Sequence, residues 1–128
     1  PAFELIDDRN ANYSTVDLIS AAADNSWNAN SVLGQRQINF KHLDFDNNLV
    51  SKTVNGKKEK SVTGAALGNP FNSVLWIANL ISELGQELRK GQIIMTGSTF
   101  ATYFPHIGDK IHYEIEGIGE ISIEIMET

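Results

Sequence analysis

The chain has 128 residues, 41% of them hydrophobic, which suits a single domain with a real core over residues 1–128. Its 10 Lys and Arg residues stand against 16 Asp and Glu residues, and the net charge of −6 excludes nucleic acid as an expected partner, because phosphate binding needs concentrated positive charge. The sequence lacks cysteine, a membrane-spanning apolar stretch and a secretory signal, so we expect no disulfide, no thiolate metal site, no membrane partner and a cytoplasmic location.

The N-terminal third of the chain predicts a strand and a short helix. Residues 2–8 alternate in a way that favours a strand. Residues 18–23 are predicted to form a short helix, and the Asn- and Ser-rich stretch 25–31 is predicted to be the loop that follows it.

Two segments in the middle of the chain, joined by a turn dipeptide, predict a β-hairpin. Residues 49–54 and 58–63 flank Asn55-Gly56, the dipeptide that best tolerates the positive φ angles of a type I′ turn. We therefore expect these two segments to pair as antiparallel strands.

The clearest helix signal follows a glycine-rich entry. Asn69 can cap a helix whose first-turn residue is Pro70, because a proline in that position loses no hydrogen bond. Gly85 supplies the left-handed residue that commonly follows a helix. The apolar residues at helical spacing, which we expect to be buried as one stripe, are Val74, Leu75, Ile77, Ala78, Ile81 and Leu84.

A short apolar run after this helix leads into a polar loop. Residues 93–95 are predicted to form a buried strand that ends at Thr96-Gly97-Ser98. Such a loop can bring backbone N–H groups and hydroxyls to a ligand, and it can equally be a polar turn that closes the strand.

The C-terminal segment predicts a second hairpin. Residues 111–115 and 121–125 alternate apolar with polar side chains, and Gly117-Ile118-Gly119 would connect them. The whole order of elements predicts an α+β fold, with mixed β-sheets and two helices rather than regular βαβ alternation.

Glu4 is the strongest candidate for chemistry in the first predicted strand. It lies between the apolar residues Phe3 and Leu5, so its carboxylate is expected close to buried surface. An unpaired buried carboxylate is costly, and a divalent cation is one way to stabilise it. The alternatives are an edge strand with Glu4 in water and an ion pair between Glu4 and Arg9.

Motifs in order along the whole chain carry a family resemblance. They are 1–9, Ala23-Asp24-Asn25, 32–34, 64–70, 76–79, Gly85, Leu88, Gly91, Thr96-Gly97-Ser98, Gly108-Asp109 and 117–119. With this order and spacing, the chain resembles the C-terminal part of the fumarylacetoacetate hydrolase superfamily, and most closely its 2-keto-4-pentenoate hydratase branch. The resemblance implies that the single domain corresponds to the C-terminal half of a hydratase-family catalytic domain.

The resemblance implies a metal site that this chain supplies only in part. In the family, a Glu at the position of Glu4 is one of three carboxylates that hold Mg²⁺ or Mn²⁺, cations that prefer oxygen ligands. The other two carboxylates, and the lysine and aspartates of the acid–base steps, belong to an upstream segment, so no catalytic residue is assigned here. We therefore expect a homo-oligomer, or completion by an N-terminal segment or a partner chain.

The resemblance also implies a substrate pocket lined by Ser26, Trp27, Thr96, Gly97 and Ser98. The family usually places a serine where Trp27 stands, and Ser26 takes that role if the loop shifts by one residue. The Trp27 indole would narrow the pocket or stack on a flat substrate, or it is simply a core or interface aromatic. The loop 96–98 would hydrogen-bond the carboxylate of a 2-oxo acid.

The implied activity is that of a metal-dependent hydratase, a lyase of aromatic-acid catabolism. It would add water to a 2-hydroxy-dienoate or 2-oxo-enoate, with the metal stabilising the charge of the enolate. A 2-oxo acid decarboxylase of the same family is the alternative. A catalytically silent relative that serves as a binding or assembly domain is a third interpretation.

Overall fold

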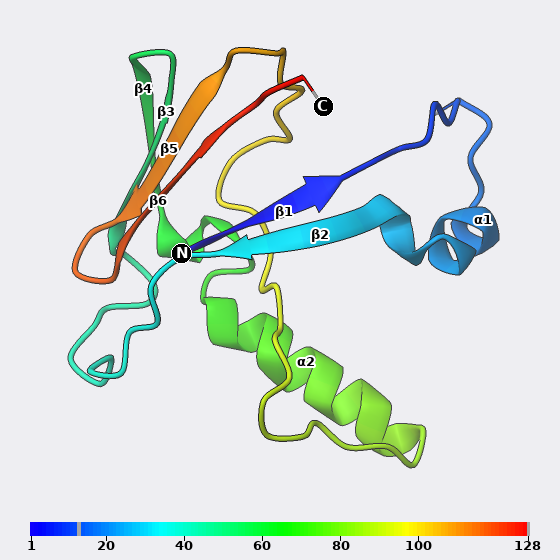
Figure 1. The fold of residues 1–128 in the computed structure, drawn as a ribbon. Helices are drawn as coiled ribbons and strands as arrows, with labels where there is room; N and C mark the ends of the chain where they lie inside the picture. Colours follow the sequence, from blue (N-terminus) through cyan, green and yellow to red (C-terminus); the bar gives the residue numbers. More distant parts are fainter. Residues whose placement is uncertain (13, 128) are drawn as a thin grey trace.

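The fold combines two helices with two separate sheets, so the predicted α+β class is confirmed (Figure 1). The computed structural model describes residues 1–12 and 14–127. Both sheets are antiparallel, whereas the sequence suggested mixed sheets. The elements are β1 (Ala2–Ile6), α1 (Leu18–Ala23), η1 (Asn25–Trp27), β2 (Asn28–Leu33), β3 (Leu49–Val54), β4 (Lys57–Val62), η2 (Thr63–Ala65), α2 (Pro70–Glu83), β5 (Lys110–Ile115) and β6 (Gly119–Glu124).

The larger sheet has four strands in the order β4-β3-β5-β6. Both predicted hairpins are present, and Asn55 and Gly56 have the positive φ angles, 49° and 84°, that the first turn requires. Alternation along the strands gives one polar face and one apolar face. Val50, Ile111 and Ile121 lie on the apolar face and are buried.

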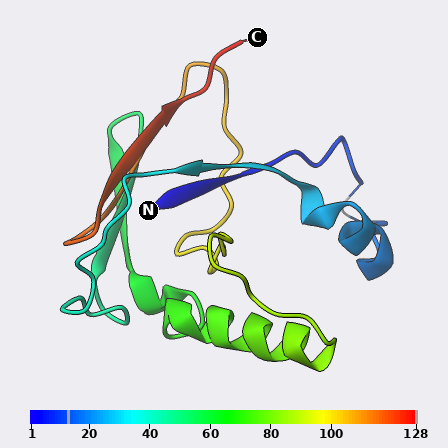
Figure 2. The same cartoon turned by 60° about the horizontal axis from the view of Figure 1, so that its bottom comes forward.

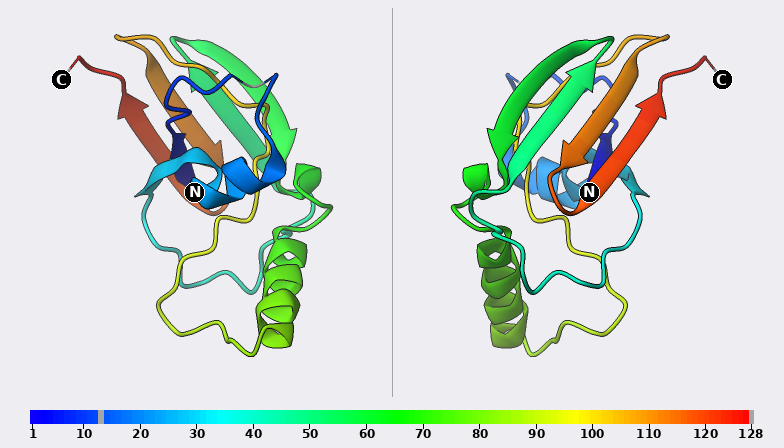
Figure 3. Two further views of the ribbon diagram at one scale, coloured as in Figure 1. Left: turned by 90° about the vertical axis from the view of Figure 1, so that its right-hand side faces the viewer. Right: turned by 90° about the vertical axis from the view of Figure 1, so that its left-hand side faces the viewer.

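The smaller sheet is a two-stranded ribbon of β1 and β2 that extends away from the larger sheet to α1 (Figures 1 and 3). The prediction of a loop over 25–31 is wrong, because β2 begins at Asn28 and pairs with β1. The β2 sequence has little intrinsic strand preference, so the backbone hydrogen bonds of β1 decide its conformation. A register shift between Leu5 and Ile6 ends the regular pairing at Asn28.

Helix α2 begins and ends where the sequence predicted. The Asn69 side chain accepts a hydrogen bond from Phe71 N at 2.8 Å, and Gly85 has a φ of 73°. The expectation of one buried stripe is only partly correct, because Leu75 and Leu84 are 62% and 68% exposed and no residue of α2 is fully buried. Within the described residues, no further layer covers the outer side of this helix (Figure 2).

The predicted strand over residues 93–95 is absent. The segment between α2 and β5 is irregular, and Ile93 is 63% exposed. Among the described residues, no strand pairs with this run. A strand needs a hydrogen-bonding neighbour, so the apolar sequence of residues 93–95 was not sufficient to form one.

The buried core is small for a chain of this length. Among residues 1–12 and 14–127, the buried hydrophobic residues are Val50, Ala66, Ile111 and Ile121. Other large apolar side chains are exposed, including Leu18, Leu75 and Trp76 at 90%, 62% and 65%. Where such exposed apolar side chains form a contiguous patch, they are typical of surfaces that contact other protein. In the part of the chain described here, neither helix is long and apolar enough for a membrane span.

A buried carboxylate fastens the start of β5 to the first hairpin. Asp109 accepts hydrogen bonds from His106 N at 2.8 Å, Asn55 Nδ2 at 2.7 Å and the Tyr103 hydroxyl at 2.8 Å. These donors lower the pKa of Asp109 to about 2 because they favour its charged form, and the His106 amide has the largest effect. Ionised Asp109 therefore stabilises the fold.

Asp109→Asn should lower the melting temperature at neutral pH by roughly 5 °C, because it removes the charge that three donors face. The folded-state pKa of Asp109 lies below the ordinary value of 3.8, so its stabilisation is complete above pH 3.8 and is lost as the pH falls toward 2. The difference between wild type and variant should shrink over that interval in thermal melts. Glu87→Gln, at a carboxylate with 77% exposure, is the control and should show no such difference.

Candidate functional site

Glu4 lies on β1 opposite Ser31, and its side chain is exposed. Asn28 Nδ2 donates a hydrogen bond to Glu4 Oε1 at 2.8 Å across the ribbon. Arg9 does not pair with Glu4, because Arg9 Nη1 lies 2.6 Å from Asp24 Oδ2. The Glu4 carboxylate is therefore oriented by one amide and open to a ligand on its other oxygen.

The acidic residues of this chain do not form a complete metal site. Among the described residues, no three His, Cys, Asp or Glu side chains lie close enough to hold a metal ion. Glu114 has other partners, since its carboxylate lies 3.8 Å from Lys58 Nζ and accepts a hydrogen bond from Ser51 Oγ at 3.3 Å. Within the described residues, Glu4 could therefore serve only as a single ligand and not as part of a three-residue set.

Ser26 and Trp27 lie on η1, the turn that connects α1 to β2. Ser26 is exposed and Trp27 is half-buried. Trp27 O accepts a hydrogen bond from Asp7 N at 3.0 Å, and the next residue, Asn28, contacts Glu4. The structure thus places the turn carrying the predicted pocket residues beside the strand that carries Glu4.

The loop Thr96-Gly97-Ser98 packs against the start of α2. Ser73 Oγ donates to Thr96 O at 2.7 Å. A Cβ on Gly97 would lie 3.3 Å from Ala66 Cβ, so the close approach favours glycine. Ser98 Oγ donates to Phe100 O at 2.5 Å, so its hydroxyl must exchange this partner before it can donate to a ligand.

Tyr113 of β5 connects this loop to β1. Its hydroxyl shares a hydrogen bond of 2.9 Å with Thr99 Oγ1, and its ring centroid lies 6.0 Å from Phe3 and 6.2 Å from Phe100. Burial raises the pKa of Tyr113, despite the opposing effect of the Thr99 hydrogen bond, so the phenol stays neutral. The Lys52 ammonium, 4.9 Å from the Phe100 centroid, adds a cation–π contact to this loop anchor.

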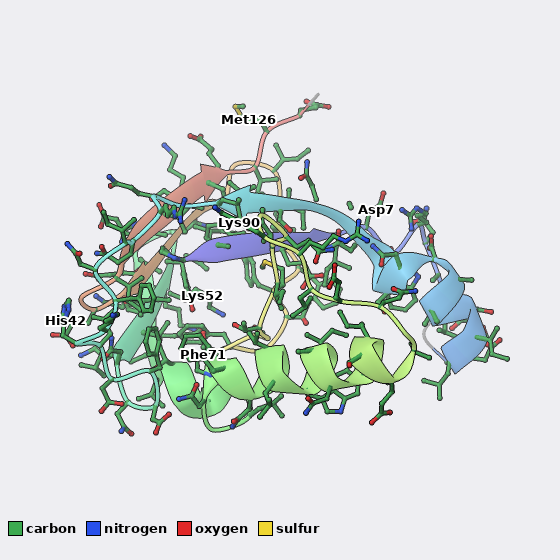
Figure 4. All side chains as sticks on the ribbon, turned by 90° about the horizontal axis from the view of Figure 1, so that it is seen from below. Asp7, His42, Lys52, Phe71, Lys90 and Met126 are labelled. Carbon is green, nitrogen blue, oxygen red and sulfur yellow. The ribbon has the colours of Figure 1, made fainter. Side chains whose placement is uncertain are left out.

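Figure 4 shows two residues that contact parts of the candidate site, since Lys52 lies over the Phe100 ring and Asp7 N donates to Trp27 O. It labels Lys52 on the side of the larger sheet that faces α2, and Asp7 at the α1 end of the ribbon.

Sequence reasoning missed two residues of this site, Asn28 and Tyr113. The sequence pointed to Tyr113, because a tyrosine at an apolar-facing strand position needs a hydrogen-bond partner for its hydroxyl. No feature of the sequence pointed to Asn28.

The chain is similar over nearly its full length to two kinds of curated protein, although no protein-family model matches it. A 4-oxalocrotonate decarboxylase of Pseudomonas putida is 37% identical over 123 residues, which are 95% of this chain and 46% of the relative. A 2-keto-4-pentenoate hydratase of Paraburkholderia xenovorans (strain LB400) is 32% identical over 127 residues, covering 97% of this chain and 46% of the relative. The chain therefore spans about half the length of the curated relatives it matches.

Solved structures agree with this similarity. The 4-oxalocrotonate decarboxylase from Pseudomonas putida G7, complexed with magnesium and adipate, matches with a TM-score of 0.88 and 32% identity over 98% of this chain and 48% of that chain. The same enzyme complexed with calcium and acetate matches with a TM-score of 0.85 and 32% identity over 98% of this chain and 47% of that chain. The fold described above is thus the fold of one part of a longer enzyme in these relatives.

Proposed function

We propose that this chain is part of a divalent-metal-dependent hydratase. The chain belongs to the family of 2-keto-4-pentenoate hydratases and 4-oxalocrotonate decarboxylases, and it corresponds to the C-terminal part of its members. This family is of the fumarylacetoacetate hydrolase type. The reaction is the addition of water to a 2-hydroxy-dienoate or 2-oxo-enoate, a lyase step in aromatic-acid catabolism in the cytoplasm. The natural substrate is a small 2-oxo acid.

The observation that carries this proposal is the arrangement around Glu4. Its carboxylate is exposed, oriented by Asn28, and adjacent in the ribbon to the turn that bears Trp27. Glu4 would be the ligand that this chain gives to Mg²⁺ or Mn²⁺, which prefer carboxylate oxygens. When bound, the ion supplies charge stabilisation to the developing enolate.

The remaining pocket residues would orient the substrate. Ser26 and Trp27 would form one wall, with the indole able to stack on a flat conjugated acid. Thr96, Gly97 and Ser98 would offer N–H and hydroxyl groups to the carboxylate of the substrate. The matched solved structures contain magnesium with adipate and calcium with acetate, a divalent cation and a carboxylate each time, which supports this class of ligand.

Completion by other protein is part of the proposal. The remaining metal ligands and the acid–base groups would come from an N-terminal segment or a partner chain, and the relatives are about twice the length of this chain. The exposed apolar face of α2 is a surface that such a segment, or another copy in a homo-oligomer, would cover.

Decarboxylation of a 2-oxo acid is the second candidate, and the 37% identity to a 4-oxalocrotonate decarboxylase favours it. The natural protein that carries this chain, loaded with Mg²⁺ or Mn²⁺, should be assayed with 2-keto-4-pentenoate and with 4-oxalocrotonate. Hydration should consume the first compound without release of carbon dioxide. Release of carbon dioxide from the second alone would support the decarboxylase, and inactivity toward both would support a binding or assembly domain.

A further inference from the structure

The α1 end of the β1–β2 ribbon contains two turns with an unusual backbone. In the first turn, Arg9 and Asn10 have φ angles of 49° and 59°. In the second, Asn25, Ser26 and Trp27 have φ angles of 50°, 50° and 62°. Asparagine tolerates this left-handed region, but a bulky side chain rarely adopts it. The conformation at Trp27 therefore depends on contacts that hold the turn in place.

The first turn is fixed by its own aspartates. Asp7 Oδ1 accepts a hydrogen bond from Arg9 N at 2.9 Å, and Asp8 Oδ1 accepts one from Asn10 N at 3.0 Å. The backbone of Arg9 is thereby held, and its guanidinium reaches the second turn, where Nη1 lies 2.6 Å from Asp24 Oδ2. Because the backbone of Arg9 is already ordered by its hydrogen bond to Asp7, its contact with Asp24 costs side-chain freedom but little further backbone freedom.

The second turn is bonded to the same residues through Trp27. Trp27 N donates to Asp24 O at 2.9 Å, and Trp27 O accepts from Asp7 N at 3.0 Å. We call Asp7, Arg9 and Asp24 the turn clasp. Both backbone polar groups of Trp27 are bonded to the turn clasp, and Asn28, the next residue, contacts Glu4.

We infer that Arg9 is a positioning residue, which through Asp24 holds the turn 25–27 and so sets where the Trp27 indole lies. The role of that indole in the pocket rests on the proposed function, whereas the effect of Arg9 on Trp27 does not. The side chains of Arg9 and Asp24 are 50% and 42% exposed, and such ion pairs contribute little to global stability. Loss of this pair therefore relaxes the turn and leaves the fold in place.

Fluorescence of Trp27 tests this inference. The chain has two tryptophans, so Trp76→Phe leaves Trp27 as the reporter. In this background, Arg9→Gln and Asp24→Asn should each shift Trp27 emission to longer wavelength and increase its quenching by acrylamide, because the half-buried indole becomes more exposed. Loss of an exposed ion pair shifts the equilibrium between the ordered and relaxed turn by roughly up to fivefold. The acrylamide quenching constant of Trp27 should therefore rise by no more than that factor.

Coupling between the two residues makes the test specific. The double variant should match the single variants, and the exchange of Arg9→Asp with Asp24→Arg should restore part of the wild-type signal. Arg89→Gln is the matched control, since Arg89 Nε forms a similar exposed pair with Glu87 at 3.7 Å, and it should leave Trp27 unchanged.

Unchanged quenching in Arg9→Gln overturns the inference. A change that occurs only with loss of helix and sheet signals in circular dichroism also overturns it, because Arg9 then supports the whole fold. In the natural protein, an unchanged KM for Trp27→Ala would refute the pocket role of Trp27 in the proposed function. That result would leave the inference about Arg9 standing.

Discussion

Glu4→Gln in the natural, metal-loaded protein should lower its affinity for Mg²⁺ or Mn²⁺ by roughly 100-fold. Changes in residues that merely orient ligands cost about 10- to 100-fold in metal affinity, so removal of a ligand should reach the upper end of that range. The variant keeps the size of the side chain and can still accept the hydrogen bond from Asn28, but it withdraws one negative charge from the cation. Turnover at limiting metal should fall with the affinity.

Titration of activity against metal concentration separates this role from a structural one. High metal should restore the activity of Glu4→Gln. Ser98→Ala should instead raise KM at every metal concentration, because the proposed function assigns the loop 96–98 to the substrate and not to the ion. Calorimetric titration of the isolated chain should show little heat at micromolar metal, since one carboxylate cannot replace a full ligand set.

Two results would contradict the assignment of Glu4. Wild-type activity of Glu4→Gln at limiting metal would mean that Glu4 is an exposed strand residue, whose substitution changes stability by only a few tenths of a kcal/mol. Tight one-to-one metal binding by the isolated chain would mean that the ligands have been assigned wrongly.

Leu75→Lys should weaken the association of the isolated chain by roughly 10- to 100-fold. We expect the wild-type chain to associate, because Leu75 and Trp76 on α2 are 62% and 65% exposed. Burial of a leucine side chain contributes about 1.5–3 kcal/mol, and each 1.4 kcal/mol corresponds to about tenfold in a dissociation constant. Sedimentation velocity over a wide concentration range measures this change.

A charge-matched variant keeps this test specific to the apolar surface. Gln86→Lys adds the same charge at an exposed position just beyond α2, and it should leave the association unchanged. A wild-type chain that sediments as a monomer at every concentration would show that the exposed face of α2 does not mediate self-association.

The elements that the sequence predicted correctly depend on local interactions. Helix α2 begins at Pro70 because the Asn69 side chain satisfies a backbone donor two residues away, and the first hairpin turns at Asn55-Gly56 because both residues accept a positive φ. These causes lie within a few residues of one another. They can therefore be read without knowledge of the rest of the fold.

The candidate site depended on neighbours that are distant in the sequence. Glu4 was a candidate from its strand position and from motif resemblance, and Trp27 from motif resemblance alone, but the hydrogen bond from Asn28 to Glu4 joins residues 24 positions apart. The pair of Arg9 with Asp24 likewise joins two turns that meet only because β1 pairs with β2. Both contacts follow from the path of the chain and have no local signature.

Local signals in this sequence suffice for the caps, the two hairpins and the class of fold, since each follows from the conformational preferences of adjacent residues. Pairing in space decides the rest. Strand β2 forms from a sequence with weak strand preference because β1 supplies hydrogen-bond partners, and residues 93–95 form no strand because no strand of the described chain pairs with them. The same rule explains the exposed side of α2, because an apolar side chain is buried only where other protein covers it.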